Sequence, residues 1–195
     1  MAGCRPLTPE EVQQVLQTFP ADYQGHRNKA LFLVGLRTGF RVSELLRLRV
    51  QDILHHGRLV DEVTIAKRHR KQRTFSHTVA LHQEAKQALQ TWLQVYQGQA
   101  DLLSGVWPLF PARQGLHAPL GRCRAWQILR EAFAQAGLSG KLGTHVMRKS
   151  YAVSMSQKLD GNIFKVCKAL GHVDIKSTMA YMPDFSEEIR RAQLA

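Results

Sequence analysis

Arginine stands at two junctions between apolar segments. Arg41 lies in the run Thr-Gly-Phe-Arg-Val-Ser-Glu-Leu that begins at Thr38, after a glycine that should end one helix and before the next helix. His145 and Arg148 are three residues apart on an expected helix and therefore face the same way. An arginine fork binds phosphate or carboxylate bidentately, and histidine exchanges protons near neutral pH. Taken singly, most such residues form structural salt bridges or lie in solvent.

Two further stretches add groups that could transfer protons or attack a substrate. His172 follows the helix-ending Gly171, and Tyr181 comes nine residues later on a second expected helix. The run from Lys67 to Arg73 is intensely basic. Each has an ordinary reading on its own, because a histidine after a glycine is usually at the surface, a helical tyrosine is usually core and a charge run is usually a solvated loop.

The composition indicates a polyanionic partner. Lys and Arg total 27 against 15 Asp and Glu, which gives a formal charge of +12. Nucleic acid is the usual partner of such an excess. A membrane surface is disfavoured because no segment joins a basic face to a strongly apolar one. The start of the chain lacks a signal-peptide pattern, and we expect a cytoplasmic protein.

Hydrophobic periodicity predicts an α+β, mainly helical fold with one small antiparallel sheet, in a single domain over 1–195. Thr8 should cap the first helix in a capping box with Glu11. A β-hairpin is expected from strands at Arg58–Ile65 and Thr74–Leu81, joined by the basic turn. Helices are expected up to residue 19, over 26–38, from Ser43 through Leu48, and over 82–97, 123–136, 145–158, 162–170, 175–181 and 186–193, with an irregular stretch at 98–121.

Together the four stretches resemble the catalytic domain of the tyrosine recombinase (phage integrase) family over nearly the whole chain. The order is Arg41, basic hairpin, His145-x-x-Arg148, and Leu-Gly-His172 with its spacing to Tyr181. The resemblance implies that Tyr181 attacks a DNA phosphodiester, forms a 3′-phosphotyrosine and frees a 5′-hydroxyl. No metal and no cofactor are expected.

The resemblance also implies roles for the other residues. Arg41 and Arg148 would clamp the phosphate and His172 would add a donor. Lys67, with Lys71 as the alternative, would protonate the leaving oxygen. A free phenol titrates near 10, so only about 0.1% is ionised at pH 7, and His145 is the candidate base.

The expected partner is double-stranded DNA carrying specific recombination sites, bound by a self-associated protein that forms a tetramer in the synaptic complex. Lysine stands at 149, where the family often has histidine. The regions around Arg47 and Arg49 and around 122–130 could enter the major groove. The residues expected to contact DNA are Lys71, Arg73, Lys149, Arg122 and Arg124.

The family's usual amino-terminal, core-binding domain is absent from this chain. A piece of a longer protein and a naturally short member, like small bacterial recombinases that invert promoter segments, both fit. The tail at 182–195 could dock onto a neighbouring protomer through Phe185 and Ile189 or stay with its own chain. Two other functions remain open, a type IB topoisomerase and a DNA-binding regulator that does not cleave. Bacterial cytoplasm or nucleoid is the expected location.

Overall fold

The computed structural model describes residues 4–69, 75–98, 106–113, 117–182 and 186–194, and it leaves out the side chains of 186–189. The chain divides into two compact units, Met1–Tyr151 and Ala152–Ala195. The mainly helical α+β class with small antiparallel sheets is confirmed. None of the helices within the described part of the chain is long and apolar enough to cross a membrane.

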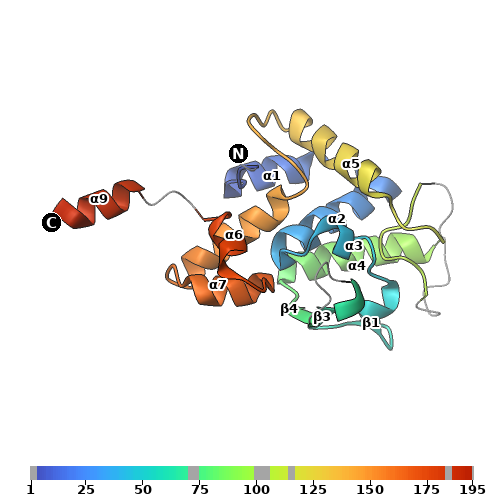
Figure 1. Cartoon of the computed structure of the whole chain (residues 1–195). Coiled ribbons are helices and arrows are strands. Elements are labelled where there is room, and N and C mark those ends of the chain that lie inside the picture. Colours follow the sequence, from blue (N-terminus) through green and yellow to red (C-terminus); the bar gives the residue numbers. More distant parts are fainter. Residues whose placement is uncertain (1–3, 70–74, 99–105, 114–116, 183–185, 195) are drawn as a thin grey trace. The chain divides into compact units, whose positions relative to one another are not determined.

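The frame of the first unit is helical (Figure 1). Helices α2 (Tyr23–Thr38) and α4 (Gln83–Gln97) pack against each other, and α1 (Pro9–Gln17) packs on α5 (Arg122–Gln135). The apolar faces of these helices form one core, which includes the fully buried Trp92. The capping box at the start of α1 is confirmed, because the Thr8 hydroxyl accepts a hydrogen bond from the Glu11 N–H and the Glu11 carboxylate accepts one from the Thr8 N–H.

Helix α2 begins earlier than the sequence pattern indicated. Asp22 is its N-cap and accepts a hydrogen bond from the Gly25 N–H at 2.7 Å, so the first turn starts at Tyr23 rather than at His26. The helix ends at Gly39, which has a left-handed φ of 65°. A short helix, α3 (Val42–Leu45), follows directly.

The expected strand over Arg58–Ile65 is wrong as one continuous element. Strand β2 (Arg58–Leu59) pairs with β1 (Leu54–His55), across a turn whose residues His56 and Gly57 both have positive φ. Strand β3 (Glu62–Ile65) pairs instead with β4 (His77–Ala80), in antiparallel register. The break lies at Asp61, whose carboxylate binds Lys86 of α4 and whose carbonyl accepts a hydrogen bond from the Leu81 N–H. A short 3₁₀ turn, η1 (Val50–Asp52), precedes the first hairpin.

The described parts of the segment at 106–121 are held by side chains from the helical frame. Trp92 Nε1 donates to the Leu109 carbonyl at 2.8 Å, and the Tyr96 hydroxyl donates to that of Pro108 at 3.2 Å. The buried Arg27 donates through Nη1 to the Pro111 carbonyl at 2.8 Å. The predicted irregular stretch is therefore fixed wherever its residues are described.

Helix α6 (Val146–Lys158) begins in the first unit and continues into the second. Within the second unit, α7 (Ile163–Leu170) ends at Gly171 in a left-handed turn and packs on the short helix α8 (Ile175–Met179). Helix α9 (Ser186–Leu194) is the last element. The predicted ends of these helices agree with the structure to within one or two residues.

Candidate active site

Arg148, on helix α6, is hydrogen-bonded to the residue that ends helix α2. Its side chain is 2% exposed, and Nη1 donates a hydrogen bond of 2.5 Å to the carbonyl of Gly39, 109 residues away in sequence. Gly39 cannot be replaced easily, because a Cβ there would lie 2.3 Å from Cδ1 of Tyr151 and φ is positive. Arg148 is therefore held by the same turn that presents Arg41 two residues later.

Arg41 is oriented by a buried carboxylate. Glu44 is 3% exposed; its Oε1 accepts a hydrogen bond from Arg41 Nη1 at 2.9 Å and its Oε2 accepts one from the Arg41 backbone N–H at 2.8 Å. Glu44 belongs to the motif around Arg41, but no role was predicted for it from the sequence. Its position three residues after Arg41, at the start of α3, is the capping-type spacing that could have identified it.

His145 was expected to begin the helix over 145–158, but it lies in the turn one residue before α6. Its carbonyl accepts a hydrogen bond from the Lys149 N–H at 2.8 Å, which makes it the helix-capping position. The ring is exposed at the surface. Desolvation by the surrounding protein, and then repulsion by Arg148, Arg41 and Arg122, lower the pKa of His145 below its usual value. A lowered pKa keeps the imidazole neutral at pH 7 and able to accept a proton.

The hairpin formed by β3 and β4 precedes and follows Lys67. Its last paired residues contact the turn at 39–41 between α2 and α3, which we call the arginine turn. His77 of β4, paired with Ile65, packs edge-on against Phe40 with ring centroids 5.8 Å apart. Lys67 begins the 3₁₀ turn η2 (Lys67–His69), and its backbone N–H donates to Ser76 Oγ at 3.2 Å. The end of the hairpin nearest Lys67 therefore lies beside Phe40, the residue that precedes Arg41. The Lys67 side chain is exposed.

The residues predicted to contact DNA fall in different surroundings. Arg122 begins α5, is exposed, and is close enough to His145 to lower its pKa. Arg124 is also exposed, and it pairs with Gln127 and Glu131 along the same helix. Lys149 lies near Cys4, where its charge opposes the rise in thiol pKa that burial causes. Lys71 and Arg73 lie outside the described residues.

The second unit places its two candidate residues together. The rings of His172 and Tyr181 lie 5.6 Å apart, and His172 Nδ1 shares a hydrogen bond of 2.8 Å with the hydroxyl of Thr178. Thr178 was not predicted from the sequence, because no local pattern links residues six apart across a turn. Among the described residues, no three His, Cys, Asp or Glu side chains are grouped as metal ligands.

The expectation that Tyr181 lies on a helix is wrong. Helix α8 ends at Met179, and Tyr181 lies in the following turn. The Tyr181 N–H donates to the Thr178 carbonyl and the Met182 N–H donates to the Met179 carbonyl, which are tighter, 3₁₀-type bonds that close the helix. The turn leaves the Tyr181 side chain half-buried.

Each unit can therefore perform part of a reaction at a phosphate ester. The first unit presents two fixed guanidinium groups, which suit a phosphate because their charge is permanent and their donors are planar, and a neutral imidazole beside them. The second unit presents a phenol and an imidazole. A phenol oxygen is a nucleophile that can form a covalent intermediate.

Comparisons with known proteins agree with this chemistry. The regulatory protein FimE of type 1 fimbriae, from Escherichia coli K12, is 29% identical over 93% of this chain and 86% of its own length. The tyrosine recombinase XerD of Mycobacterium tuberculosis is 30% identical over 90% of this chain and 55% of its own length. The site-specific recombinase XerH, solved on its difH DNA substrate, has a TM-score of 0.73 at 22% identity, over 96% of this chain and 51% of that one.

The chain therefore spans about half the length of XerD and XerH and most of the length of FimE. Because the identity to XerH is low, this structural similarity shows only that the two chains share a fold. The family match is broader, because residues 5–188 match the phage integrase family as a whole. With this match and with its arginines, histidines and tyrosine in the family's order, the chain belongs to the phage integrase family of tyrosine recombinases, enzymes that cleave and rejoin DNA.

Proposed function

We propose that this chain is a site-specific recombinase that cuts and rejoins DNA through a covalent 3′-phosphotyrosine at Tyr181. The observation that carries the proposal is that Arg148 is held by the Gly39 carbonyl and Arg41, two residues after Gly39, is held by Glu44, with His145 close enough for both charges to lower its pKa. Two cations at one junction match the negative charge that gathers on the phosphate oxygens in the transition state.

The proposed reaction has one bond made and one broken in each step. The Tyr181 oxygen attacks the phosphorus, the phenol proton passes to His145, and the bond from phosphorus to the 5′-oxygen breaks. Lys67 gives its proton to that oxygen, which leaves as a 5′-hydroxyl. The 5′-hydroxyl of a second strand then reverses these transfers and reseals the DNA, so the bond energy is conserved and no ATP is needed.

We propose that the two units act as one catalytic domain. The phosphate clamp belongs to the first unit and the nucleophile to the second, so both are needed at the same phosphodiester. His172 would donate to a phosphate oxygen, with Thr178 setting the orientation of its ring. Lys67 rather than Lys71 is the proposed acid, because its backbone N–H binds Ser76, the neighbour of the His77 ring that packs against Phe40.

The proposed partner is double-stranded DNA with specific recombination sites, and XerH, which has this fold, was solved on such a substrate. Arg122, Arg124, Lys149, Lys71 and Arg73 would contact it. We propose a tetramer in the synaptic complex, linked by exchange of the tail over 182–195. The proposed anchors of this tail, Phe185 and the side chain of Ile189, lie outside the part of the chain that the structure describes. A protein acting on genomic DNA would work in the bacterial cytoplasm or nucleoid.

Covalent trapping tests the proposal. A nicked suicide duplex carrying candidate sites is incubated without metal with the wild-type protein and with Tyr181→Phe, which keeps the ring but lacks the nucleophilic oxygen. We expect a denaturation-resistant adduct with the wild type alone. An adduct of equal yield with Tyr181→Phe would overturn the proposal. Relaxation of any supercoiled plasmid, with no transfer between two site-bearing duplexes, would instead indicate a type IB topoisomerase.

A further inference from the structure

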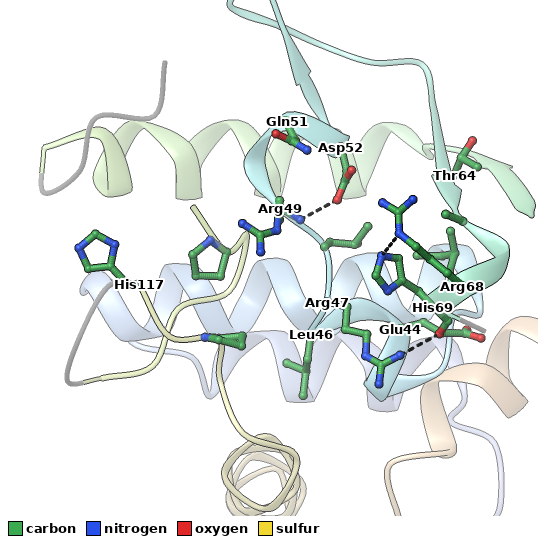
Figure 2. Close-up of a pocket in the computed structure, with 15 residues that line it drawn as sticks. Glu44, Leu46, Arg47, Arg49, Gln51, Asp52, Thr64, Arg68, His69 and His117 are labelled. Carbon is green, nitrogen blue, oxygen red and sulfur yellow. Dashed lines mark hydrogen bonds between the residues drawn. The ribbon is translucent and has the colours of Figure 1, made fainter. Parts of the chain in front are cut away.

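The first unit contains a cleft of about 430 Å³ that the reaction described above does not use. It lies between the stretch that follows helix α3 and the turn at the end of strand β3 (Figure 2). Its floor includes the apolar side chains of Leu46, Leu48 and Ile65. Its polar lining is mainly basic, with Arg47, Arg49, Arg68, His69 and His117.

The two carboxylates that line the cleft are already engaged. Glu44 binds Arg41, and Asp52 accepts a hydrogen bond from the Arg49 backbone N–H at 2.8 Å. Within the described residues, neither carboxylate forms an ion pair with the guanidinium groups of the three arginines that face this space. Desolvation and the charges of Arg68 and Arg47 lower the pKa of His69, so this ring contributes hydrogen bonds rather than charge.

The arginines are held in place by neutral groups that leave their charge uncompensated. Arg47 Nη1 donates to the His69 carbonyl at 3.3 Å, and Arg49 Nη1 donates to the Val106 carbonyl at 2.6 Å. Arg68 Nε donates to His69 Nε2 at 3.1 Å, and the two side chains lie together in Figure 2. A guanidinium has five N–H donors, so each retains donors for an anion that enters the cleft.

The wall opposite the hairpin is also fixed. Arg49 pairs with Pro108 in an isolated β-bridge, and the Leu109 N–H donates to the Leu48 carbonyl at 2.8 Å. The hydrogen bonds from Arg27, Trp92 and Tyr96 hold the same segment from the side of the core. The space between the walls is therefore set by folding, and an anion that enters it meets donors already in position.

The cleft shares one lining residue, Glu44, with the surroundings of Arg41. Glu44 lines the cleft and orients Arg41, so one buried carboxylate stands between the two places. Lys67 lies in sequence between Ala66 and Arg68, which both line the cleft. A strand of DNA whose phosphate is bound at Arg41 and Lys67 would bring a neighbouring phosphate toward this basic lining.

We propose that this cleft binds one backbone phosphate of the DNA substrate, next to the phosphate that is cleaved, through Arg47, Arg49 and Arg68. The inference rests on the proposed function for its DNA substrate. It differs from the expectation that the region around Arg47 and Arg49 could enter the major groove, because a guanidinium nitrogen of each donates to a main-chain carbonyl. A phosphate bound in this way sets the register of the protein on DNA and adds affinity without sequence preference.

The dependence of DNA affinity on salt tests the proposal. Affinity for a labelled duplex of arbitrary sequence is measured between 50 and 200 mM salt, because each phosphate that the protein neutralises contributes ~0.9 to the slope of log K against log salt. We expect the slope of the double variant Arg47→Gln/Arg68→Gln to be shallower by about that amount, which corresponds to one phosphate. The matched control Arg58→Gln/Lys158→Gln removes the same charge at exposed positions outside the cleft and should leave the slope unchanged.

Conservative replacement separates phosphate binding from damage to the fold. Arg47→Lys/Arg68→Lys keeps both charges, so most of the wild-type slope should return. Equal reductions of the slope in the glutamine and lysine variants, or in the glutamine and control variants, would overturn the proposal. Inorganic phosphate is the second probe: if it shifts the His69 ring signals while the DNA slope stays the same in the glutamine variant, the cleft takes free anions and not DNA.

The covalent trapping assay, run on the same proteins, keeps the two claims apart. A wild-type adduct together with an unchanged slope in the glutamine variant would overturn the cleft proposal alone. A reduced slope with no wild-type adduct at any site would support phosphate binding in the cleft and count against the proposed recombinase reaction.

Discussion

In the first unit, the two active-site arginines are hydrogen-bonded to oxygens of the protein, the Gly39 carbonyl and the Glu44 carboxylate. In the second unit, by contrast, Tyr181 lies in a turn and its ring is next to that of His172. Arg148 is 2% exposed and bound to the Gly39 carbonyl, and Arg41 is bound twice to Glu44. Tyr181 is half-buried, two residues beyond the end of a helix of five residues.

The difference shows which parts of the chemistry must be fixed before the substrate arrives. Charges that stabilise a transition state are most effective when they need no rearrangement during the reaction. A nucleophile has another requirement, because its oxygen must reach the phosphorus and later accept a bond to it. The turn after α8 holds Tyr181 by backbone hydrogen bonds and leaves its side chain partly open.

Removing the buried arginine should have the largest effect on the rate of adduct formation. Arg148→Ala takes a donor from the transition state, and we expect the rate of adduct formation to fall by about 10²–10³. It also removes the partner of the Gly39 carbonyl, at a cost of roughly 1–3 kcal/mol in the free energy of unfolding. Both are measured directly, by single-turnover trapping and by urea denaturation. Arg148→Lys keeps the charge and should recover part of the rate; an unchanged rate in Arg148→Ala would remove this residue from the site.

His145 should control the acid side of the pH profile. Because its pKa lies below the usual histidine value, the ring is neutral at pH 7 and becomes protonated as the pH falls. The rate of adduct formation should therefore be constant near neutrality and decline below the usual histidine pKa of about 6.5. His145→Gln should lower the rate by about 10² or more and abolish that decline. An acid limb that persists in His145→Gln would assign it to another group.

Adding one methyl group at Gly39 should destabilise the turn between α2 and α3. Gly39→Ala combines a left-handed φ of 65° with a Cβ placed 2.3 Å from Tyr151, so we expect a loss in the free energy of unfolding greater than the ~1–3 kcal/mol of backbone strain alone. Gly137→Ala is the matched control, with a φ of 69° and no heavy atom within 4 Å of the added carbon. Equal losses in the two variants would show that the clash with Tyr151 is unimportant.

Loss of the hydrogen bond between Thr178 and His172 should lower the trapping rate less than the loss of Arg148. Thr178→Val keeps the shape of the side chain and removes the hydroxyl that binds His172 Nδ1. A net hydrogen bond of ~0.5–1.5 kcal/mol corresponds to a fall of roughly two- to tenfold in the trapping rate. Thr178→Ser retains the hydroxyl and should stay near the wild-type rate. A loss as large as that of Arg148→Ala would contradict the contrast between the two units.

Local signals in the sequence were sufficient for the parts of the fold that local interactions determine. The capping box at Thr8, the end of a helix at Gly39 and the hairpin between β3 and β4 were all predicted from residues close together in the chain. The early start of α2 was missed because Asp22 was not considered as a cap. The break lies at Asp61, whose partners Lys86 and Leu81 are distant in sequence and are not indicated by the local pattern.

The candidate functional residues were proposed from the sequence, but the groups that hold them in place were not. The family resemblance supplied Arg41, His145 and Arg148, which the structure brings to one junction. The groups that hold these residues were not recognised, because the Gly39 carbonyl is 109 residues from Arg148 and every residue has a carbonyl. Glu44 was missed as well, although its spacing from Arg41 was visible in the sequence.

The most direct measurement is to locate the covalent bond itself. The wild-type protein is trapped on a nicked suicide duplex without metal, digested with protease, and the peptide that carries the nucleotide is identified by mass spectrometry. We predict a 3′-phosphoryl group on the oxygen of Tyr181, with a free 5′-hydroxyl on the released strand. A nucleotide attached to another side chain, or a cut strand with no attached peptide, would contradict the role of Tyr181 as the nucleophile.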